Sequence, residues 1–266
     1  MRTVKIAVHG ATGRMGLAVL RAVMDASDVE VAAALVRPGS QFDGEPVEKL
    51  LGRSGPHLEF SSVLDPDLHL DVLVDFTVAQ SFDAGLALAR ARGCAFVSGT
   101  TGLDAAQQSS LDAAAESIAV LWASNFSLGV AVMCRLAAHA ARALGRGFDA
   151  EIVELHHRHK QDAPSGTALT LAEVVAAARG RSIDTVGRFA RHGHAGPRAE
   201  DEIGVLALRG GDAIGEHSVL FLGDGERLEL SHRVSDRGIF ARGAVAAARW
   251  ISGRSAGRYD MADLFG

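Results

Sequence analysis

The sequence predicts an α/β protein, in which a doubly wound parallel sheet is followed by a second, α+β domain with a mixed or antiparallel sheet. Three observations predict this class. Apolar strand-like runs alternate with helical periodicity up to about residue 127, a three-glycine loop joins the first run to the first helix, and later strand-like runs are separated by glycine-rich turns. We expect a first domain at 1–127, completed by a C-terminal helix at 238–266 that packs back on it, and a second domain at 128–237.

The elements of the first domain follow in a regular order. VKIAVHG at 4–10 is an apolar run that ends in glycine and predicts a buried strand. Helical spacing of apolar residues follows over 15–24, and VEVAAALV at 29–36 predicts the second strand. The same patterns predict strands at 71–77, 95–102 and 118–125, and helices at 81–93 and 103–117. This alternation predicts a parallel sheet covered by helices on both faces.

The pattern changes in the second half. A long helix over 127–144 leads to a strand at 148–157, and another helix begins near Ser165. Three strand-like runs follow, IGVLALR, EHSVLFL and ERLELSHRV. The Gly-Gly-Asp and Gly-Asp-Gly segments between them predict antiparallel hairpins. The stretch FARGAVAAARWISG then predicts the closing amphipathic helix.

Composition excludes several classes of protein. The 266 residues are 48% hydrophobic, enough for a packed core. With 27 Lys and Arg against 32 Asp and Glu, there is no basic surplus for a nucleic acid or an anionic membrane, and no run of 18 apolar residues predicts a membrane span. The N-terminus has no leader pattern, so we expect a cytoplasmic protein. Cys94 and Cys134 lack metal-binding spacing and are expected to be buried, reduced thiols.

The loop GATGRMG predicts a dinucleotide site in a Rossmann-like domain. Gly10 allows a tight exit from the strand, Gly13 lets a pyrophosphate approach the backbone, and Gly16 lets helix and strand pack closely. The helix N-terminus adds N–H groups and a positive dipole. The spacing is G-x-x-G-x-x-G rather than G-x-G-x-x-G, and an ordinary turn is the alternative interpretation.

The residues after the second predicted strand bear on the choice of cofactor. An acid there would hold the adenosine ribose hydroxyls, but the sequence has Val36 followed by Arg37. An arginine suits a ribose 2′-phosphate, so NADPH is predicted to be preferred or well tolerated, with NADH as the other possibility. The alternative is that Arg37 is a solvated loop residue.

Two further loops are expected to complete the cofactor site, because ligands of open α/β sheets lie beyond the carboxyl ends of the strands. SGTTG contributes Gly99, Thr100 and Thr101, and ASNF contributes Asn125 and Phe126 toward the nicotinamide end. Small polar residues are also common in ordinary turns, which is the competing interpretation.

The densest group of functional side chains is HHRHK, at 156–160. Lysine otherwise occurs only at Lys5 and Lys49, whereas 24 of the 27 basic residues are arginine, which cannot release a proton in a protein. Three interpretations compete. A zinc site lacks a suitable spacing and would face two cations, a solvated basic turn is possible, and the third is a site that holds and protonates an anionic substrate.

The downstream segment Asp162-Ala-Pro-Ser-Gly-Thr favours the third interpretation. Ser165 or Thr167 can cap a helix whose first N–H groups, at Gly166 and Thr167, offer a seat for a carboxylate. Positions 156 and 160 fall on one side of either a strand or a helix, so His156 and Lys160 are expected to face one ligand. A hydride donor beside such proton donors predicts reduction of a polarised double bond in a small acidic substrate.

At this point the chain resembles a known family along its whole length. GATGRMG, SGTTG, ASNFSLGV, ELHHRHKQDAPSGTA, RGGDAIGEHSVLF and SHRVSDRGIFARGA are similar to segments of the 4-hydroxy-tetrahydrodipicolinate reductase (dihydrodipicolinate reductase) family. The resemblance implies hydride transfer from NAD(P)H to the cyclic imine dicarboxylate, which gives tetrahydrodipicolinate for lysine and diaminopimelate synthesis. It also implies a homotetramer assembled through the sheets of a substrate-binding second domain.

The resemblance assigns roles to individual residues. It implies that His156 donates or accepts a proton and that Lys160 donates one, with no metal. It implies that the substrate is bound by His157, Gly166 and Thr167. It implies that the cofactor is bound by Gly10, Ala11, Thr12, Gly13, Arg14, Met15, Arg37, Gly99, Thr100, Thr101, Ala123, Ser124, Asn125 and Phe126. Val36 departs from family members that carry an acid there.

Two other kinds of protein would share the glycine loop. A short-chain dehydrogenase needs a Tyr four residues before a Lys, but the only tyrosine, Tyr259, is followed by Asp-Met-Ala-Asp. The remaining alternative is a non-catalytic, dinucleotide-sensing regulator, which would have no use for His156 and Lys160.

Overall fold

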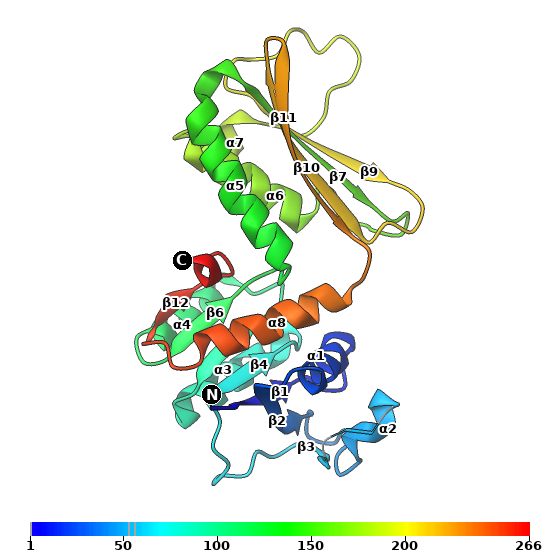
Figure 1. Ribbon diagram of the computed structural model, residues 1–266, viewed down its shortest axis with the longest axis vertical. Coiled ribbons are helices and arrows are strands. Elements are labelled where there is room, and N and C mark those ends of the chain that lie inside the picture. Colours follow the sequence, from blue (N-terminus) through cyan, green and yellow to red (C-terminus); the bar gives the residue numbers. More distant parts are fainter. Residues whose placement is uncertain (1, 53, 56) are drawn as a thin grey trace. The chain divides into compact units, whose positions relative to one another are not determined.

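The computed structural model describes residues 2–52, 54, 55 and 57–266, and the chain forms two compact units (Figure 1). The first unit consists of the chain up to Phe126 together with Gly238–Gly266. The second unit is the single segment Ser127–Arg237. The chain therefore leaves the first unit to build the second and then returns.

The first unit is a doubly wound parallel sheet, as the alternating pattern predicts. Its seven strands lie in the order β12-β6-β5-β4-β1-β2-β3, and every pair is parallel. The strands are β1 (Val4–His9), β2 (Val29–Leu35), β3 (Phe60–Ser61), β4 (Val72–Asp75), β5 (Ala95–Ser98), β6 (Ala119–Trp122) and β12 (Gly257–Tyr259). The helices are α1 (Arg14–Met24), α2 (Val47–Leu51), α3 (Ala79–Arg92), α4 (Ala105–Ala115), α8 (Gly238–Ile251) and the 3₁₀ turn η2 (Asp263–Phe265).

Helices cover both faces of this sheet because its strands are apolar on both sides. β4 and β5 are buried along their whole length. On one face Leu73 and Phe96 pack with Phe82 of α3 and Leu111 of α4, and the rings of Phe82 and Phe96 meet edge to face at 5.8 Å. On the other face α1 and α8 pack together over the strands.

The predicted strands extended too far at their carboxyl ends. The runs expected at 71–77, 95–102 and 118–125 stop as strands at Asp75, Ser98 and Trp122, and the residues that follow form loops at the carboxyl edge of the sheet. The helix expected at 238–266 ends at Ile251 and is followed by β12 and η2. α2, β3 and β12 were not predicted, since two to five residues are too short to show a period.

The second unit is α+β with a mixed sheet, in the order β11-β10-β7-β9-β8. Its strands are β7 (Asp149–His156), β8 (Gly187–Arg188), β9 (Ile203–Arg209), β10 (Gly215–Gly223) and β11 (Glu226–Val234). Its helices are α5 (Leu128–Leu144), the 3₁₀ turn η1 (Gly145–Gly147), α6 (Gly166–Ala178) and α7 (Ile183–Val186). α5 and α6 pack against each other and against the sheet, and Ile152, Val205, Val219 and Phe221 lie in the shared core.

One of the two predicted hairpins is wrong. β10 and β11 pair antiparallel through the Gly-Asp-Gly turn as expected, but β9 does not pair with β10. β7 lies between them, parallel to β9 and antiparallel to β10. The Gly-Gly-Asp segment instead passes over the end of β7, where Gly210 N–H donates to the carbonyl of His156 and His157 N–H donates to that of Ala213. β7 therefore lies in the centre of the sheet and pairs with a neighbouring strand on each side.

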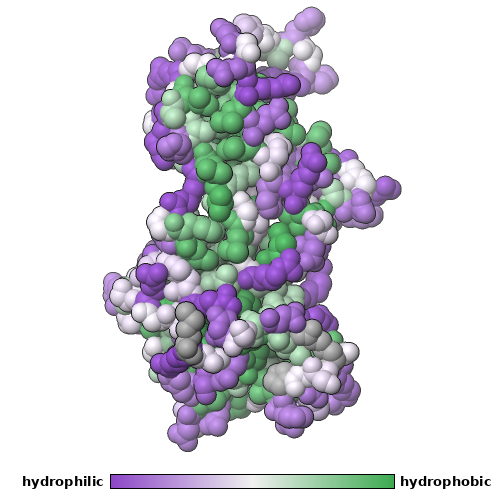
Figure 2. Space-filling view, in the orientation of Figure 1, coloured by the Kyte–Doolittle hydropathy of each residue, from purple (hydrophilic) through white to green (hydrophobic). Residues whose placement is uncertain are grey.

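Helix α5 has an apolar surface on two sides. Among the described residues, the stretch Leu128–Gly147 is long and apolar enough to cross a membrane by length and composition, a test that core helices of soluble proteins also pass. Met133, Ala137 and Ala141 pack in the core of the second unit. Val132 and Leu136 are exposed, and Figure 2 shows hydrophobic atoms over this helix.

The two cysteines differ in burial. Cys94 is buried, and burial raises the pKa of its thiol to about 11. Cys134 is only partly buried, contrary to the prediction, because it lies at the margin of the core on α5. No disulfide joins the pair.

Candidate active site

The glycine loop lies between β1 and α1, as predicted. Gly10 has φ +80, and a Cβ there would lie 2.8 Å from the carbonyl oxygen of Phe76, so only glycine fits. Gly13 is the residue that precedes α1. A Cβ on Gly16 would lie 2.2 Å from the carbonyl oxygen of Gly10, so the helix lies directly against the loop. The positive end of α1 is thereby held at the carboxyl edge of the sheet.

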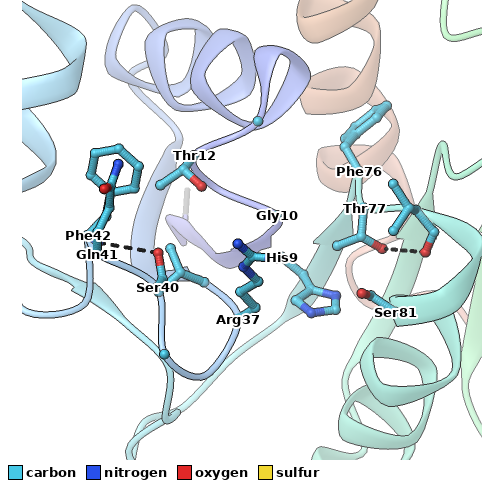
Figure 3. A pocket seen from close by; sticks show the side chains of 14 residues that line it. His9, Gly10, Thr12, Arg37, Ser40, Gln41, Phe42, Phe76, Thr77 and Ser81 are labelled. Atoms are coloured by element: carbon cyan, nitrogen blue, oxygen red, sulfur yellow. Dashed lines mark hydrogen bonds between the residues drawn. The ribbon is translucent and has the colours of Figure 1, made fainter.

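A cavity of about 640 Å³ opens beside this loop (Figure 3). Four of the predicted cofactor residues line it: Gly10, Thr12, Gly13 and Arg37. In Figure 3 the side chains of Arg37 and His9 lie between Thr12 on one side and Thr77 with Ser81 on the other. A glycine-rich cradle with a guanidinium beside it suits the phosphates of a dinucleotide.

Other predicted residues of this loop lie differently. Ala11 is fully buried, so only its backbone is near the loop surface. Arg14 and Met15 form the first turn of α1 and are outside the residues that line the cavity. Val36 is buried at the end of β2, with its N–H donating to the carbonyl of Ser61.

The prediction missed the loops that follow β2 and β4. Residues 39–42 and Phe76, Thr77, Val78 and Ser81 also line the cavity. The signal was available, because β4 lies next to β1 and its carboxyl end must therefore face the same edge.

Asp75 gathers side chains from three strand ends, and it was also missed. Its side chain is 0% exposed. Oδ1 accepts a hydrogen bond from Thr77 Oγ1 at 2.8 Å and lies 3.0 Å from Nδ1 of His9. Oδ2 accepts from Ser98 Oγ at 2.8 Å and from Thr100 Oγ1 at 2.7 Å. One acid at the end of an otherwise apolar strand was the available signal.

The predicted residues after β5 and β6 meet around Phe76. A Cβ on Gly99 would lie 2.2 Å from the Phe76 ring, and the Phe126 ring lies 5.3 Å from it, edge to face. Trp122 Nε1 donates to the carbonyl of Thr100 at 2.9 Å. The remaining predicted residues of these loops are Thr101 and Ser124, which are exposed, and Ala123 and Asn125, which are partly buried.

The second unit has its own cluster of polar groups, which is built on the inner face of β7. Ile152 of this strand is in the apolar core, and Glu154 and His156 follow on the same face by strand alternation. His156 is 9% exposed, and its Nδ1 lies 2.6 Å from Oε2 of Glu154. His217 of β10 lies beside them, with its ring 5.2 Å from that of His156. The strand therefore changes from core to polar site along one face.

Glu154 is an ionised carboxylate in a buried position. Arg209 donates to both of its oxygens, at 2.7 and 2.9 Å, and Ser165 N–H donates to Oε1 at 3.0 Å. Burial alone would raise the pKa of Glu154, but the hydrogen bonds from Arg209, His156 and Ser165 outweigh it and hold that pKa below its usual value. Neither Glu154 nor Arg209 is among the site residues predicted from the sequence.

Lys160 lies on a turn rather than on a continued strand or helix. β7 ends at His156, and Lys160 N–H donates to the carbonyl of His157. Lys160 Nζ donates to both oxygens of Asp162, at 2.8 and 2.7 Å. The expectation of one strand or helix face shared by positions 156 and 160 is therefore wrong, because the backbone turns between them.

The other members of the cluster are more open. His157, Arg158 and His159 line a shallow cavity with Gly211 and Asp212. Nδ1 of His157 is buried without a partner among the described residues. No group of three or more His, Cys, Asp or Glu in the described ranges could hold a metal ion.

The predicted carboxylate seat lies at the start of α6. The helix begins at Gly166, with Thr167 in its first turn. Ser165 is the capping residue, since its Oγ accepts from Ala168 N–H at 3.2 Å. The same Oγ lies 2.9 Å from Nε2 of His217. The positive end of α6 is thus fixed next to the Glu154 cluster.

Acid should destabilise the protein through His217. Burial, and after it the neighbouring His156, lowers the pKa of His217 to about 4, against about 6.5 in an unfolded chain. The unfolded state therefore binds more protons between these values, and the free energy of unfolding falls by up to about 3 kcal/mol as pH drops through this window. Urea unfolding of wild type and His217→Gln at pH 7 and 4.5 should show a smaller loss in the variant. An equal loss of unfolding free energy in wild type and His217→Gln would contradict this prediction. The control is His192→Gln, because His192 is exposed.

The fold and the glycine-loop cavity define a dinucleotide-dependent oxidoreductase with a Rossmann-type unit. Two family models match the chain: "Dihydrodipicolinate reductase, N-terminus" over residues 4–126 and "Dihydrodipicolinate reductase, C-terminus" over 129–265. The chain belongs to the dihydrodipicolinate reductase family. The C-terminal model runs through α8 and β12, which in space belong to the first unit.

Similar proteins agree over nearly the whole chain. The 4-hydroxy-tetrahydrodipicolinate reductase of Alkalilimnicola ehrlichii is 47% identical and that of Pseudomonas fluorescens SBW25 is 48% identical, covering 99% and 98% of both chains, respectively. The solved structure of dipicolinate-bound dihydrodipicolinate reductase from Paenisporosarcina sp. TG-14 has a TM-score of 0.77 at 25% identity and covers 97% of each chain. A probable dehydrogenase from Thermotoga maritima shares the fold alone, with a TM-score of 0.63 at 9% identity.

Proposed function

We propose that this chain reduces the cyclic imine dicarboxylate derived from 4-hydroxy-tetrahydrodipicolinate to tetrahydrodipicolinate, the reductase step of lysine and diaminopimelate synthesis. The observation that carries the proposal is that proteins named 4-hydroxy-tetrahydrodipicolinate reductase match 98–99% of this chain. In the second unit of this chain, residues 156–166 hold His156, Lys160 and the start of α6. NAD(P)H, when bound, supplies the hydride.

The residues of the second unit would hold and protonate the substrate. A dicarboxylate needs donors, which the positive end of α6 at Gly166 and Thr167 and the imidazole of His157 can supply. Lys160 would deliver the proton, and Asp162 holds its ammonium group until then. His156 would donate or accept a proton through its ring in the same reaction, which consumes one proton together with the hydride. The first unit would therefore bind the cofactor, and the second unit would bind the substrate.

The cofactor residues proposed from the sequence fit a dinucleotide. The contact of Gly16 with Gly10 packs α1 closely on the loop, and the absence of a side chain at Gly13 would let a pyrophosphate approach the backbone. Arg37 lines the same cavity, and buried Val36 offers no carboxylate to the ribose hydroxyls. We therefore propose that NADPH is preferred to NADH.

Changing Arg37 to Gln should reduce this preference. The guanidinium would make a charge-assisted hydrogen bond to the 2′-phosphate, whose loss costs about 2 kcal/mol or roughly 30-fold in the KM for NADPH. The KM for NADH should change less than about twofold, because NADH lacks that phosphate. Steady-state kinetics with both cofactors tests this, with Arg90→Gln on α3 as the control. Parallel changes for both cofactors would contradict the assignment.

The function itself is tested by following loss of reduced-nicotinamide absorbance. The imine is generated in place from pyruvate and aspartate semialdehyde by its synthase, and NADPH and NADH are run in parallel. Oxidation that depends on the synthase is the expected result. Protein that binds cofactor but oxidises neither would refute the proposed reaction and favour a dinucleotide-sensing role.

We also propose that the chain acts in the cytoplasm as a homotetramer joined through the sheet of the second unit. The outer face of that sheet carries exposed apolar residues, with Leu208 53% and Leu222 36% exposed. β11 is a nine-residue edge strand that is mostly exposed, and such an edge readily pairs with another chain. Light scattering after size exclusion should give four times the 27.8 kDa mass. A monomer would contradict the assembly, and Leu208→Glu should weaken it.

A further inference from the structure

We propose that Glu154 is a positioning residue of the polar cluster in the second unit, which fixes the ring of His156 and, through Arg209, the turn that carries Lys160. The proposal rests on the proposed function, because it concerns a residue that acts through the two proton-transfer groups. No comparison assigns a role to Glu154 or to Arg209.

The carboxylate of Glu154 is placed to organise several groups at once. It is 0% exposed, and four donors converge on it: the Nδ1 of His156, two nitrogens of Arg209 and the N–H of Ser165. A buried carboxylate costs several kcal/mol unless such partners compensate it. The group is therefore held in one position by three separate segments, the strand β9, the end of β7 and the cap of α6.

This contact decides how His156 presents its ring. An ionised carboxylate can only accept, so Nδ1 of His156 carries the proton and Nε2 is the nitrogen left for proton exchange with a ligand. A Cβ on Gly215 would lie 3.0 Å from that Nε2, so the absence of a side chain at Gly215 keeps this side of the ring open. The geometry matches the carboxylate–histidine pairs that orient catalytic imidazoles.

Arg209 extends the same arrangement to Lys160. Besides its two bonds to Glu154, its NH2 donates to the main-chain carbonyl of Asp162 at 2.7 Å. The side chain of Asp162 in turn accepts from the Lys160 ammonium. One continuous series of contacts therefore runs from His156 through Glu154, Arg209 and Asp162 to Lys160.

Replacing Glu154 by Gln tests the proposal in the full-length enzyme. The amide keeps the shape but loses the charge and brings a donor toward Arg209 and His156, so we expect kcat to fall roughly 10- to 100-fold, which is less than the about 10²- to 10⁴-fold that complete loss of a proton-transfer group costs. The KM for the cofactor should stay within about twofold. Glu151→Gln is the matched control, since Glu151 is on the same strand, faces the other way and is also held by two arginines, Arg191 and Arg198.

A double-mutant cycle separates positioning from a general structural role. If Glu154 acts through His156 as well as through Lys160, then Glu154→Gln should lower kcat by a smaller factor in the His156→Asn background than in wild type, whereas independent structural damage would multiply. Multiplied losses, or wild-type kcat in Glu154→Gln, would overturn the proposal.

If Glu154→Gln does not fold by circular dichroism, two other variants are measured in its place. Glu154→Asp keeps the charge, and Arg209→Gln breaks the link to Lys160. Each of these two variants should have a lower kcat and an unchanged KM for the cofactor. Wild-type kcat in both variants would refute the positioning role of Glu154. An inactive wild type would instead refute the proposed function.

Discussion

Replacing Lys160 by Gln is expected to lower turnover by about a hundredfold or more while cofactor binding stays nearly unchanged. Glutamine is similar in length and can still donate a hydrogen bond, but its amide cannot release a proton. Lys160 lies on the turn after β7, in the second unit, so the glycine loop and its cavity are unaffected. Turnover is measured in the synthase-coupled assay, and cofactor affinity by titration of the nicotinamide fluorescence.

Lys49→Gln is the matched control for this change. Lys49 is one of the two other lysines, and its Nζ also donates to a carboxylate, that of Glu45 at 2.8 Å. Lys49→Gln should leave turnover unchanged, because this ion pair lies on the surface, with Lys49 on α2 and Glu45 just before it. Turnover within about twofold of wild type in Lys160→Gln would remove this residue from the proton-transfer step.

Gly16→Ala is expected to have the second large effect, this time on cofactor binding. The new methyl group would lie 2.2 Å from the carbonyl oxygen of Gly10, a backbone atom that cannot rotate away. Either α1 or the loop must move, at a cost of about 1–3 kcal/mol. If the loop moves, this cost corresponds to a loss of roughly 5- to 150-fold in affinity for the cofactor. Fluorescence titration with NADPH and urea unfolding measure the two consequences.

The control for Gly16 is a glycine with space around it. A Cβ on Gly147 meets nothing within 4 Å, and no positive φ is required there, so Gly147→Ala should alter neither property. Wild-type affinity and stability in Gly16→Ala would mean that the helix and loop are less closely packed than the structure indicates.

The sequence predicted those parts of the fold and site that depend on neighbouring residues. The β1–loop–α1 unit could be located because strand, glycines and helix follow one another within about 20 residues. The cap of α6 at Ser165 follows from a short motif in the same way. In each case the interacting groups are close along the chain, so spacing alone carries the information.

The parts that could not be predicted depend on distant pairing. β7 separates β9 from β10, and nothing in the turn between those two strands indicates a third strand. The contact of Arg209 with Glu154 joins positions 55 residues apart. Asp75 is the one acid of the apolar strand β4 and Glu154 is one of three acids on β7, and only the fold shows which donors surround them. Side-chain networks of this kind are set by topology, which a single sequence does not display.

The return of the chain to the first unit also sets an order of events on the ribosome. α8 and β12 are translated last, yet α8 covers β1 and the neighbouring strands β4 to β6, and β12 pairs with β6 at the sheet edge. The second unit, by contrast, is one uninterrupted segment. During synthesis it is therefore the middle of the nascent chain that can finish folding first. Until α8 is translated, the part of the N-terminal sheet that α8 covers stays exposed beside α1, which makes that stage the one most exposed to aggregation and most dependent on chaperones.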